Sequence, residues 1–299
     1  NKMNNFKSGF VNVIGLPNAG KSSLVNAITN TITSIVTHKP QTTRERVFAI
    51  YNIDQFQIIF SDSPGYIENA YYKLHHYMNA QISTQYEDAD VFLFVHDGST
   101  TQLLSESVLN KVRESKIPKI LVINKIDIAS KAQIDLIESN YTMLLDFTAI
   151  HKVSAKTNEN VSSLLDAIKT YIPDHPAYYP EDYMSDKPIR FFLSELIREQ
   201  IFELFEDEIP YSSFVKINSC TGIDDQLELV KIDAYIVVNK ESQKSIIIGK
   251  NGTKIKELGT KSRIAIEDYL KQKVFLSLTV KFEKNWRDND AVLNKLLGV

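Results

Sequence analysis

The fold is decided by the stretch Gly15-Leu16-Pro17-Asn18-Ala19-Gly20-Lys21-Ser22, a glycine-rich turn between two regular elements. The apolar run at 10–14 is typical of a strand, and residues 22–28 predict a helix with Leu24 and Ile28 on one face. Free N–H groups at a helix N-terminus attract anions, and the two glycines let the chain curve around a phosphate. We therefore expect a phosphate-binding loop. The alternative is a chance glycine turn, which the flanking strand and helix disfavour.

The loop also predicts how a nucleoside triphosphate is held. Lys21 is expected to reach the outer phosphates, and the Ser22 hydroxyl is expected to help coordinate Mg²⁺. The expected nucleotide contacts in this part of the chain are Asn18, Ala19, Gly20, Lys21, Ser22 and Ser23.

Composition restricts the class of protein. The chain has 299 residues, 43% hydrophobic and 24% charged, which is typical of a soluble globular protein with room for two domains. No apolar run approaches the roughly 20 residues needed to span a bilayer, and no signal peptide precedes Phe10, so we expect a cytoplasmic protein. The single Cys220 predicts neither an internal disulfide nor a metal site. Because the net charge is −3, any nucleic-acid surface must be local.

Two further segments are expected to sense the γ-phosphate. The polar stretch 37–44 predicts a loop in which Thr42 or Thr43 binds Mg²⁺, and the sequence does not choose between them. Asp62 follows the strand-like run 57–61 and is expected to hold Mg²⁺ through water, while the N–H of Gly65 is expected to contact the γ-phosphate. The predicted metal site is therefore Ser22, Thr42 or Thr43, and Asp62.

The catalytic residue is not predicted. Tyr66 follows Gly65 at the place where small signalling GTPases with a similar arrangement carry the glutamine that orients the attacking water. We therefore expect slow intrinsic turnover. A K⁺ ion near Asn18 is one candidate for a substitute positive charge.

The residues that follow the later strands are expected to recognise the base of the bound nucleotide. Residues 91–95 and 120–123 are continuous apolar runs separated by a helical stretch at 105–113, which predicts a mostly parallel sheet. Asn124-Lys125-Ile126-Asp127 follows directly. Asp127 can accept two hydrogen bonds from guanine, Asn124 braces the loop and Lys125 covers the ring. Ser154-Ala155-Lys156 is expected to refuse a base with an amine in place of guanine O6. The predicted ligands are GTP and GDP, and Asp127 disfavours an ATP-driven enzyme.

A proline- and tyrosine-rich segment divides the chain. We expect a GTP-binding domain at 1–173, a stiff linker at 174–188 and a second domain at 189–299. The second domain predicts a helix at 189–205, strands at 213–217 and 230–238, a helix-turn-helix unit at 242–270 and a final strand at 274–282.

The turn of that helical unit predicts RNA binding. A Gly-x-x-Gly turn between two helices allows close approach of a nucleic-acid backbone, and this is the KH pattern in its bacterial, type II form. The expected contacts are Ile248, Gly249, Lys250, Asn251, Gly252 and Lys254. Residues 240–299 hold 13 Lys and Arg against 7 Asp and Glu, a charge of +6 in a chain of −3. This basic tail favours single-stranded RNA. A charged helix surface with a simple capping turn is the alternative.

The combination resembles the Era family of ribosome-assembly GTPases. The resemblance covers nearly the whole chain, and its most specific parts lie in and after the linker. Ser63 stands where the family usually has threonine, and Ala19 where valine is common. The matching stretches are 17–22, Gln41-Thr42-Thr43-Arg44, Asp62-Ser63-Pro64-Gly65, Asn124-Lys125-Ile126-Asp127, Tyr179-Pro180-Glu181-Asp182, Ile197-Arg198-Glu199, Pro210-Tyr211-Ser212 and 249–252.

This resemblance implies a Mg²⁺-dependent GTPase that binds the single-stranded 3′ end of small-subunit (16S) ribosomal RNA and assists maturation of the 30S subunit. It also implies peripheral association with the inner membrane, for which the sequence offers neither a lipid anchor nor a strongly basic amphipathic helix. We expect a monomer. The alternative is a GTPase whose second domain docks a protein and makes no RNA contact.

Overall fold

The computed structural model describes residues 6–31, 44–62, 69–83, 86–223, 225 and 229–297. The chain forms two compact units, the first comprising residues 1–67 and 78–186 and the second residues 68–77 and 187–299. Within the described residues, no helix is both long enough and apolar enough to cross a membrane.

The first unit is built on a six-stranded sheet. The strand order is β2-β3-β1-β4-β5-β6, and every neighbouring pair is parallel except β2 with β3. The mostly parallel sheet is thus confirmed. The antiparallel strand β2 was not predicted from the sequence. The strands are β1 Lys7–Ile14, β2 Val47–Ile53, β3 Phe56–Asp62, β4 Val91–Asp97, β5 Lys119–Asn124 and β6 Ala149–Lys152.

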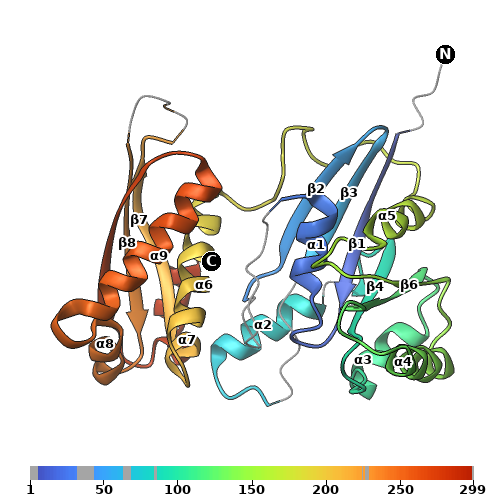
Figure 1. The fold of residues 1–299 in the computed structure, drawn as a ribbon, viewed down its shortest axis with the longest axis horizontal. Helices are drawn as coiled ribbons and strands as arrows, with labels where there is room; N and C mark the ends of the chain where they lie inside the picture. Colours follow the sequence, from blue (N-terminus) through green and yellow to red (C-terminus); the bar gives the residue numbers. More distant parts are fainter. Residues whose placement is uncertain are drawn as a thin grey trace. The chain divides into compact units, whose positions relative to one another are not determined.

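Helices cover both faces of this sheet (Figure 1). α1 (Lys21–Thr29) and α5 (Val161–Lys169) share one apolar core with the sheet, while α3 (Glu106–Arg113) and α4 (Lys131–Leu144) share the core on the opposite face. α2 spans Lys73–Ser83. The apolar runs of β4 and β5 are continuous because both faces of these strands are buried.

The proline-rich segment is attached to the first unit along β2 and β3. The N–H of Ile50 donates to the carbonyl of Met184 at 3.0 Å, and the side chain of Asn52 donates to the carbonyl of Glu181 at 3.0 Å. The segment turns where the N–H of Tyr183 donates to the carbonyl of Pro180, and it then pairs with the outer edge of β2 at Ala49 and Ser185. The domain limits expected at 173 and 189 stay a prediction.

The second unit has the element order expected for a type II KH domain. Its sheet has the order β7-β8-β9, with β8 antiparallel to β7 and parallel to β9. α6, α8 and α9 contact one face of it. α7, η3 and α10 were not predicted. The elements are α6 Ile189–Leu204, α7 Ile209–Ser212, β7 Ser213–Thr221, β8 Val230–Val238, α8 Glu241–Ile248, η2 Lys250–Gly252, α9 Thr253–Leu270, β9 Val274–Phe282, η3 Trp286–Asp288 and α10 Asp290–Leu297.

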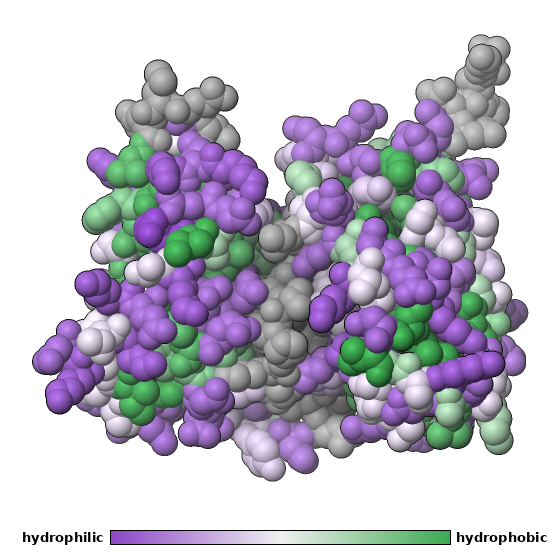
Figure 2. Space-filling view, viewed as in Figure 1, coloured by the Kyte–Doolittle hydropathy of each residue, from purple (hydrophilic) through white to green (hydrophobic). Residues whose placement is uncertain are grey.

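The apolar core of the second unit lies between these helices and the sheet. Leu193, Ile201, Ile236 and Leu258 are all fully buried within it. Hydrophilic residues predominate on the visible surface of each unit, as Figure 2 shows. The fold therefore supplies two separate frames, one for each predicted site.

Candidate functional site

The glycine-rich loop runs from the end of β1 into α1, and its two glycines are sterically required. A Cβ atom on Gly15 would lie 2.4 Å from the carbonyl oxygen of Val95. Gly20 has a φ of +91°, and a Cβ there would lie 2.2 Å from the side-chain nitrogen of Asn124. The loop can therefore follow this path only with glycine at both positions.

Lys21 folds back over the loop. Its Nζ donates to the carbonyls of Gly15 and Leu16, at 3.0 Å each. Burial lowers the pKa of the Lys21 ammonium, although the nearby carboxylate of Asp62 acts in the opposite direction. The side chain is thus held at the loop whose main-chain N–H groups start α1, where a phosphate would find both a cation and free donors.

Ser22 and Asp62 meet as expected for a metal site. The Ser22 hydroxyl donates to Asp62 Oδ2 at 2.7 Å. Asp62 is 1% exposed, and among the described residues its other oxygen, Oδ1, has no hydrogen-bond partner. A buried carboxylate oxygen without a donor is costly unless a cation or water completes it, so this pair fits a magnesium ion that retains several waters. The described part of the chain holds no group of three His, Cys, Asp or Glu suited to a metal.

Asn124 joins two loops that are far apart in sequence. Its Nδ2 donates to the carbonyl of Ala19 at 3.2 Å, and its Oδ1 accepts from the N–H of Ala155 at 3.0 Å. The buried amide therefore holds the phosphate-binding loop and the 154–156 loop at a fixed separation, consistent with the bracing role predicted for it.

Lys125 joins the same region through its ammonium. Its Nζ donates to the carbonyl of Asn18 at 2.8 Å and pairs with Asp97 Oδ2 at 2.7 Å. Burial raises the pKa of Asp97, but hydrogen bonds from Lys125 and Ser99 outweigh burial and leave that pKa below its usual value. Asp97 was not identified from the sequence. The only signal for it is its place at the carboxyl end of a buried strand.

Asp127 lies exposed at the end of this arrangement, beside the 154–156 loop. The Ser154 hydroxyl donates to Asp127 Oδ1 at 2.8 Å and accepts from the N–H of Thr157 at 3.1 Å. Ser154 is buried, so it orients the carboxylate without itself facing solvent, and Lys156 is exposed. One side of the Asp127 carboxylate is thereby fixed, and the other is available to a base.

The glycine turn of the second unit joins α8 to α9. Gly249, Asn251 and Gly252 all have positive φ, at +75°, +56° and +72°. A Cβ on Gly249 would lie 2.7 Å from the side chain of Lys254, whereas a Cβ on Gly252 would meet nothing within 4 Å. Backbone at Gly252 is therefore open to close approach by another molecule.

The residues predicted to contact RNA surround this turn. Lys250, Asn251 and Lys254 are exposed, and Ile248 is half-buried. Ile248 is joined by the half-buried Ile255, Leu276 and Leu278 in packing against the core. Cations thus lie beside apolar side chains that remain partly accessible, which suits phosphates and unstacked bases together.

Comparison with known proteins covers both units. A family model described as a 50S ribosome-binding GTPase matches residues 10–125, and a KH domain model matches residues 208–287. GTPase Era of Syntrophus aciditrophicus is 40% identical over 291 residues, covering 97% of this chain and 94% of that protein. The chain belongs to the Era family of GTPases. Its first unit is accordingly a GTPase that hydrolyses GTP, and its second is a KH domain.

Solved structures of Era extend this likeness to the whole fold. A variant of Aquifex aeolicus Era bound to GDP·AlF4⁻ has a TM-score of 0.89 at 35% identity, covering 97% of this chain and 99% of that chain. Era in complex with MgGDPNP and nucleotides 1506–1542 of 16S ribosomal RNA also has a TM-score of 0.89 at 35% identity, covering 97% and 98%.

Some predicted site residues cannot be placed. Thr42, Thr43, Gly65 and Tyr66 lie outside the described residues of this Era-family chain. The predicted roles of these four residues, and those of the other nucleotide contacts, stay predictions.

Proposed function

We propose that this GTPase binds the single-stranded 3′ end of small-subunit ribosomal RNA through its KH domain and thereby assists maturation of the 30S subunit. The nucleotide bound by the first unit sets the affinity for that RNA. In this proposal, the phosphates lie at Gly20, Lys21 and Ser22, and guanine lies at Asp127.

One observation supports the RNA part above all. The Gly249–Gly252 turn leaves the backbone at Gly252 open, with Lys250, Asn251 and Lys254 exposed around it. The excess positive charge is concentrated in residues 240–299 of an otherwise acidic chain. The similar Era structure that contains 16S ribosomal RNA nucleotides adds support for this class of partner.

Binding to a short RNA matching the small-subunit 3′ end tests this proposal. The double variant Lys250→Asp with Asn251→Asp is expected to weaken binding at least about tenfold, because it replaces phosphate contacts with repulsion. The matched control is Lys131→Asp on α4, an exposed lysine of the first unit. GDP affinity, measured with a fluorescent analogue, is expected to be unchanged in both variants. Unchanged RNA binding in the double variant would favour a protein-docking role for the second domain.

Nucleotide control is tested with the same RNA. We expect tighter binding in the presence of a non-hydrolysable GTP analogue than in the presence of GDP, because only the triphosphate orders both γ-phosphate segments. Equal affinity in the two states would contradict the control, while leaving RNA binding itself intact.

Magnesium and potassium are part of the proposed site. The Ser22 hydroxyl and Asp62, with Thr42 or Thr43, would hold Mg²⁺, which neutralises phosphate charge when bound. Support comes from the orphaned oxygen of Asp62. K⁺ near Asn18 is proposed because Tyr66 replaces the usual glutamine. Replacing K⁺ by Na⁺ is expected to slow GTP turnover, and equal turnover would remove K⁺ from the proposal.

The cytoplasmic location expected from the composition, the peripheral membrane association implied by the resemblance and the monomeric state are further parts of the proposal. A monomer is checked by light scattering, and peripheral membrane association by flotation with anionic lipid vesicles. The role in subunit maturation is checked by the accumulation of immature 30S particles in cells depleted of the protein.

A further inference from the structure

The KH sheet has a second face, opposite the helices. Along β9, Val274 and Val280 are buried in the core with the half-buried Leu276 and Leu278, and the alternating residues point the other way. The residues pointing away include Phe275, Ser277, Thr279 and Lys281, and all four are exposed. The same alternation on β8 places Lys231 and Tyr235 on this side. We call Lys231, Tyr235, Phe275, Thr279 and Lys281 the outer sheet face.

Aromatic rings and lysines are paired on the outer sheet face. Phe275 is 59% exposed and lies in register with Lys231 on the neighbouring strand. Tyr235 is in register with Thr279, and the Lys281 Nζ lies 4.0 Å from the centre of the Tyr235 ring. The two cross-strand pairs are four residues apart along the strand, which corresponds to roughly 13 Å. Each ring therefore has a cation beside it.

The remaining residues on this side are of mixed chemistry, and they include the buried Val237 and the half-buried Phe214 at the β7 end of the face. Ser219 and Thr221 on β7 are exposed and lie in register with Asp233 and Lys231. Asp233 is the acidic residue among them, and its carboxylate accepts from the Asn218 amide at 2.8 Å. Glu283 is exposed just beyond the end of β9. The Lys216 ammonium is already used, since it donates to the carbonyl of Lys295 at 2.5 Å.

The described C-terminal elements cover only part of this side. Trp286 is fully buried and packs edge-on against Phe214 on β7, with its Nε1 donating to the carbonyl of Ser212 at 2.7 Å. That contact occupies the β7 side of the sheet and leaves Phe275 and Lys231 exposed.

We propose that the outer sheet face is a second binding track for single-stranded RNA, on the side of β9 away from the glycine turn. Phe275 supplies the stacking surface for an unpaired base, Lys231 and the Lys281 that lies over the half-buried Tyr235 ring meet phosphates, and Thr279 and Ser277 offer hydrogen bonds to ribose hydroxyls. β9 contributes to both faces, since Leu276 and Leu278 lie on the side of the turn. A single-stranded RNA that leaves the glycine turn can therefore pass around β9, which is an edge strand of this sheet. The inference goes beyond the proposed function and rests on its choice of single-stranded RNA as partner.

Binding to RNAs of two lengths tests the track. One RNA of about 6 nucleotides and one of about 20 nucleotides, both matching the small-subunit 3′ end, are titrated with the full chain. Phe275→Ala is expected to weaken binding of the longer RNA about tenfold and to leave the shorter unchanged, because one stacking platform is lost. Phe275→Tyr is expected to restore binding. The matched control is Ile264→Ala on α9, a similarly exposed apolar residue at 55%.

The outcomes separate this inference from the proposed function. Equal affinity of wild type and Phe275→Ala for the longer RNA overturns the track. If the Lys250→Asp and Asn251→Asp variant binds both RNAs normally while Phe275→Ala loses the longer one, the track stands and the proposed role of the glycine turn fails. Weakened binding of both RNAs by Phe275→Ala, with an unchanged melting temperature, also overturns a separate second track.

Discussion

Gln57 is a buried amide with four hydrogen bonds inside the first unit. Its Oε1 accepts from the N–H groups of Tyr178 and Tyr179 at 2.8 and 3.0 Å. Its Nε2 donates to the carbonyl of Tyr179 at 2.8 Å and to Asn52 Oδ1 at 2.9 Å. One side chain thus fixes the proline-rich segment to the sheet.

Gln57→Ala is expected to destabilise the first unit by about 1–2 kcal/mol, because it removes three hydrogen bonds to the partly buried backbone of Tyr178 and Tyr179. The free energy of unfolding from denaturant titration measures this cost. Gln55→Ala is the matched control, since the Gln55 side chain is exposed. Equal effects of the two substitutions would contradict the role assigned to Gln57.

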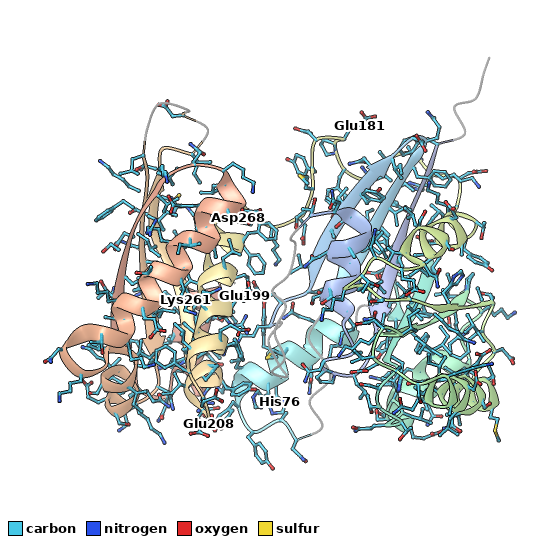
Figure 3. The ribbon with its side chains drawn as sticks, viewed as in Figure 1. His76, Glu181, Glu199, Glu208, Lys261 and Asp268 are labelled. Atoms are coloured by element: carbon cyan, nitrogen blue, oxygen red, sulfur yellow. The ribbon has the colours of Figure 1, made fainter. Side chains whose placement is uncertain are left out.

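Glu199 makes the stability of the second unit depend on pH. Figure 3 shows it on α6. Burial raises the pKa of its carboxyl to about 7, and the neighbouring Glu203 and Glu195 carboxylates add to the effect. Because the folded pKa lies above the unfolded one, folding favours the protonated form. The contribution of the protonated Glu199 carboxyl to the stability of the second unit is therefore fully present below the ordinary Glu pKa of 4.5. That contribution is lost as the pH rises through about 7.

Glu199→Gln is expected to stabilise the second unit by about 1–2 kcal/mol near pH 8, a value reduced for partial exposure to solvent. Near pH 4 the gain is expected to vanish. Thermal unfolding at the two pH values measures the difference. Glu181→Gln, at an exposed position, is the control. A gain of the same size at both pH values would show that the carboxylate charge is not its cause.

At the scale of elements, α2 is tied to the segment that enters β2. Gln81 Oε1 accepts from the N–H of Arg46 at 2.5 Å, and Gln81 Nε2 donates to the carbonyl of Arg44 at 3.0 Å. The Arg46 guanidinium also makes a two-pronged pair with Asp88, at 2.9 and 2.8 Å. The segment that follows Thr42 and Thr43 is therefore anchored to the helix that follows Gly65 and Tyr66.

Gln81→Ala is expected to weaken binding of a GTP analogue about fivefold and to change GDP affinity less, because the γ-phosphate is predicted to need both segments. Gln81→Met is expected to behave alike, since it keeps the bulk and loses the amide. His76→Ala, an exposed position on the same helix, is the control. Fluorescent nucleotide titration measures all three variants, and equal loss for GDP and the analogue would disprove the link.

Comparison of predicted and observed strands shows how much of the fold could be predicted from the sequence. The predicted strand at 274–282 matches β9, and 230–238 matches β8, because their alternation of apolar residues is local information. β2 was not predicted from the sequence. Asp54, with a φ of +52°, lies in the tight turn that joins β2 to β3. The three half-buried C-terminal residues of β2 lack a clear pattern, and its pairing partners stabilise it as a strand.

Several residues of the candidate site could be predicted from the sequence, but the contacts between them could not. Residue types at the ends of successive strands predicted Lys21, Ser22, Asp62, Asn124 and Asp127, since each motif is short and continuous. The links between motifs were not predictable. The ammonium of Lys125 bridges Asn18 and Asp97, and these contacts span 107 and 28 positions of the chain. Only the sheet order brings such residues together.

At the scale of the whole molecule, each unit has its own apolar core. One cluster includes Val11, Phe60 and Leu164 in the first unit, and another includes Leu193 and Ile236 in the second. The predicted ligands are divided in the same way, since the first unit is expected to bind a nucleotide and the second unit RNA. Ligand binding stabilises the folded form that binds it, so each ligand reports on one core.

Differential scanning calorimetry is expected to show two unfolding transitions, of which GDP with Mg²⁺ raises only one. At a ligand concentration of about 100 times the dissociation constant, the added stability is about 2.7 kcal/mol, or about 5–10 °C for a domain of this size. Lys21→Ala is expected to abolish that shift because it removes the buried ammonium at the phosphate-binding loop. The Lys250→Asp and Asn251→Asp variant is the control and is expected to keep it. A single transition that the nucleotide raised as a whole would show instead that the two units unfold together.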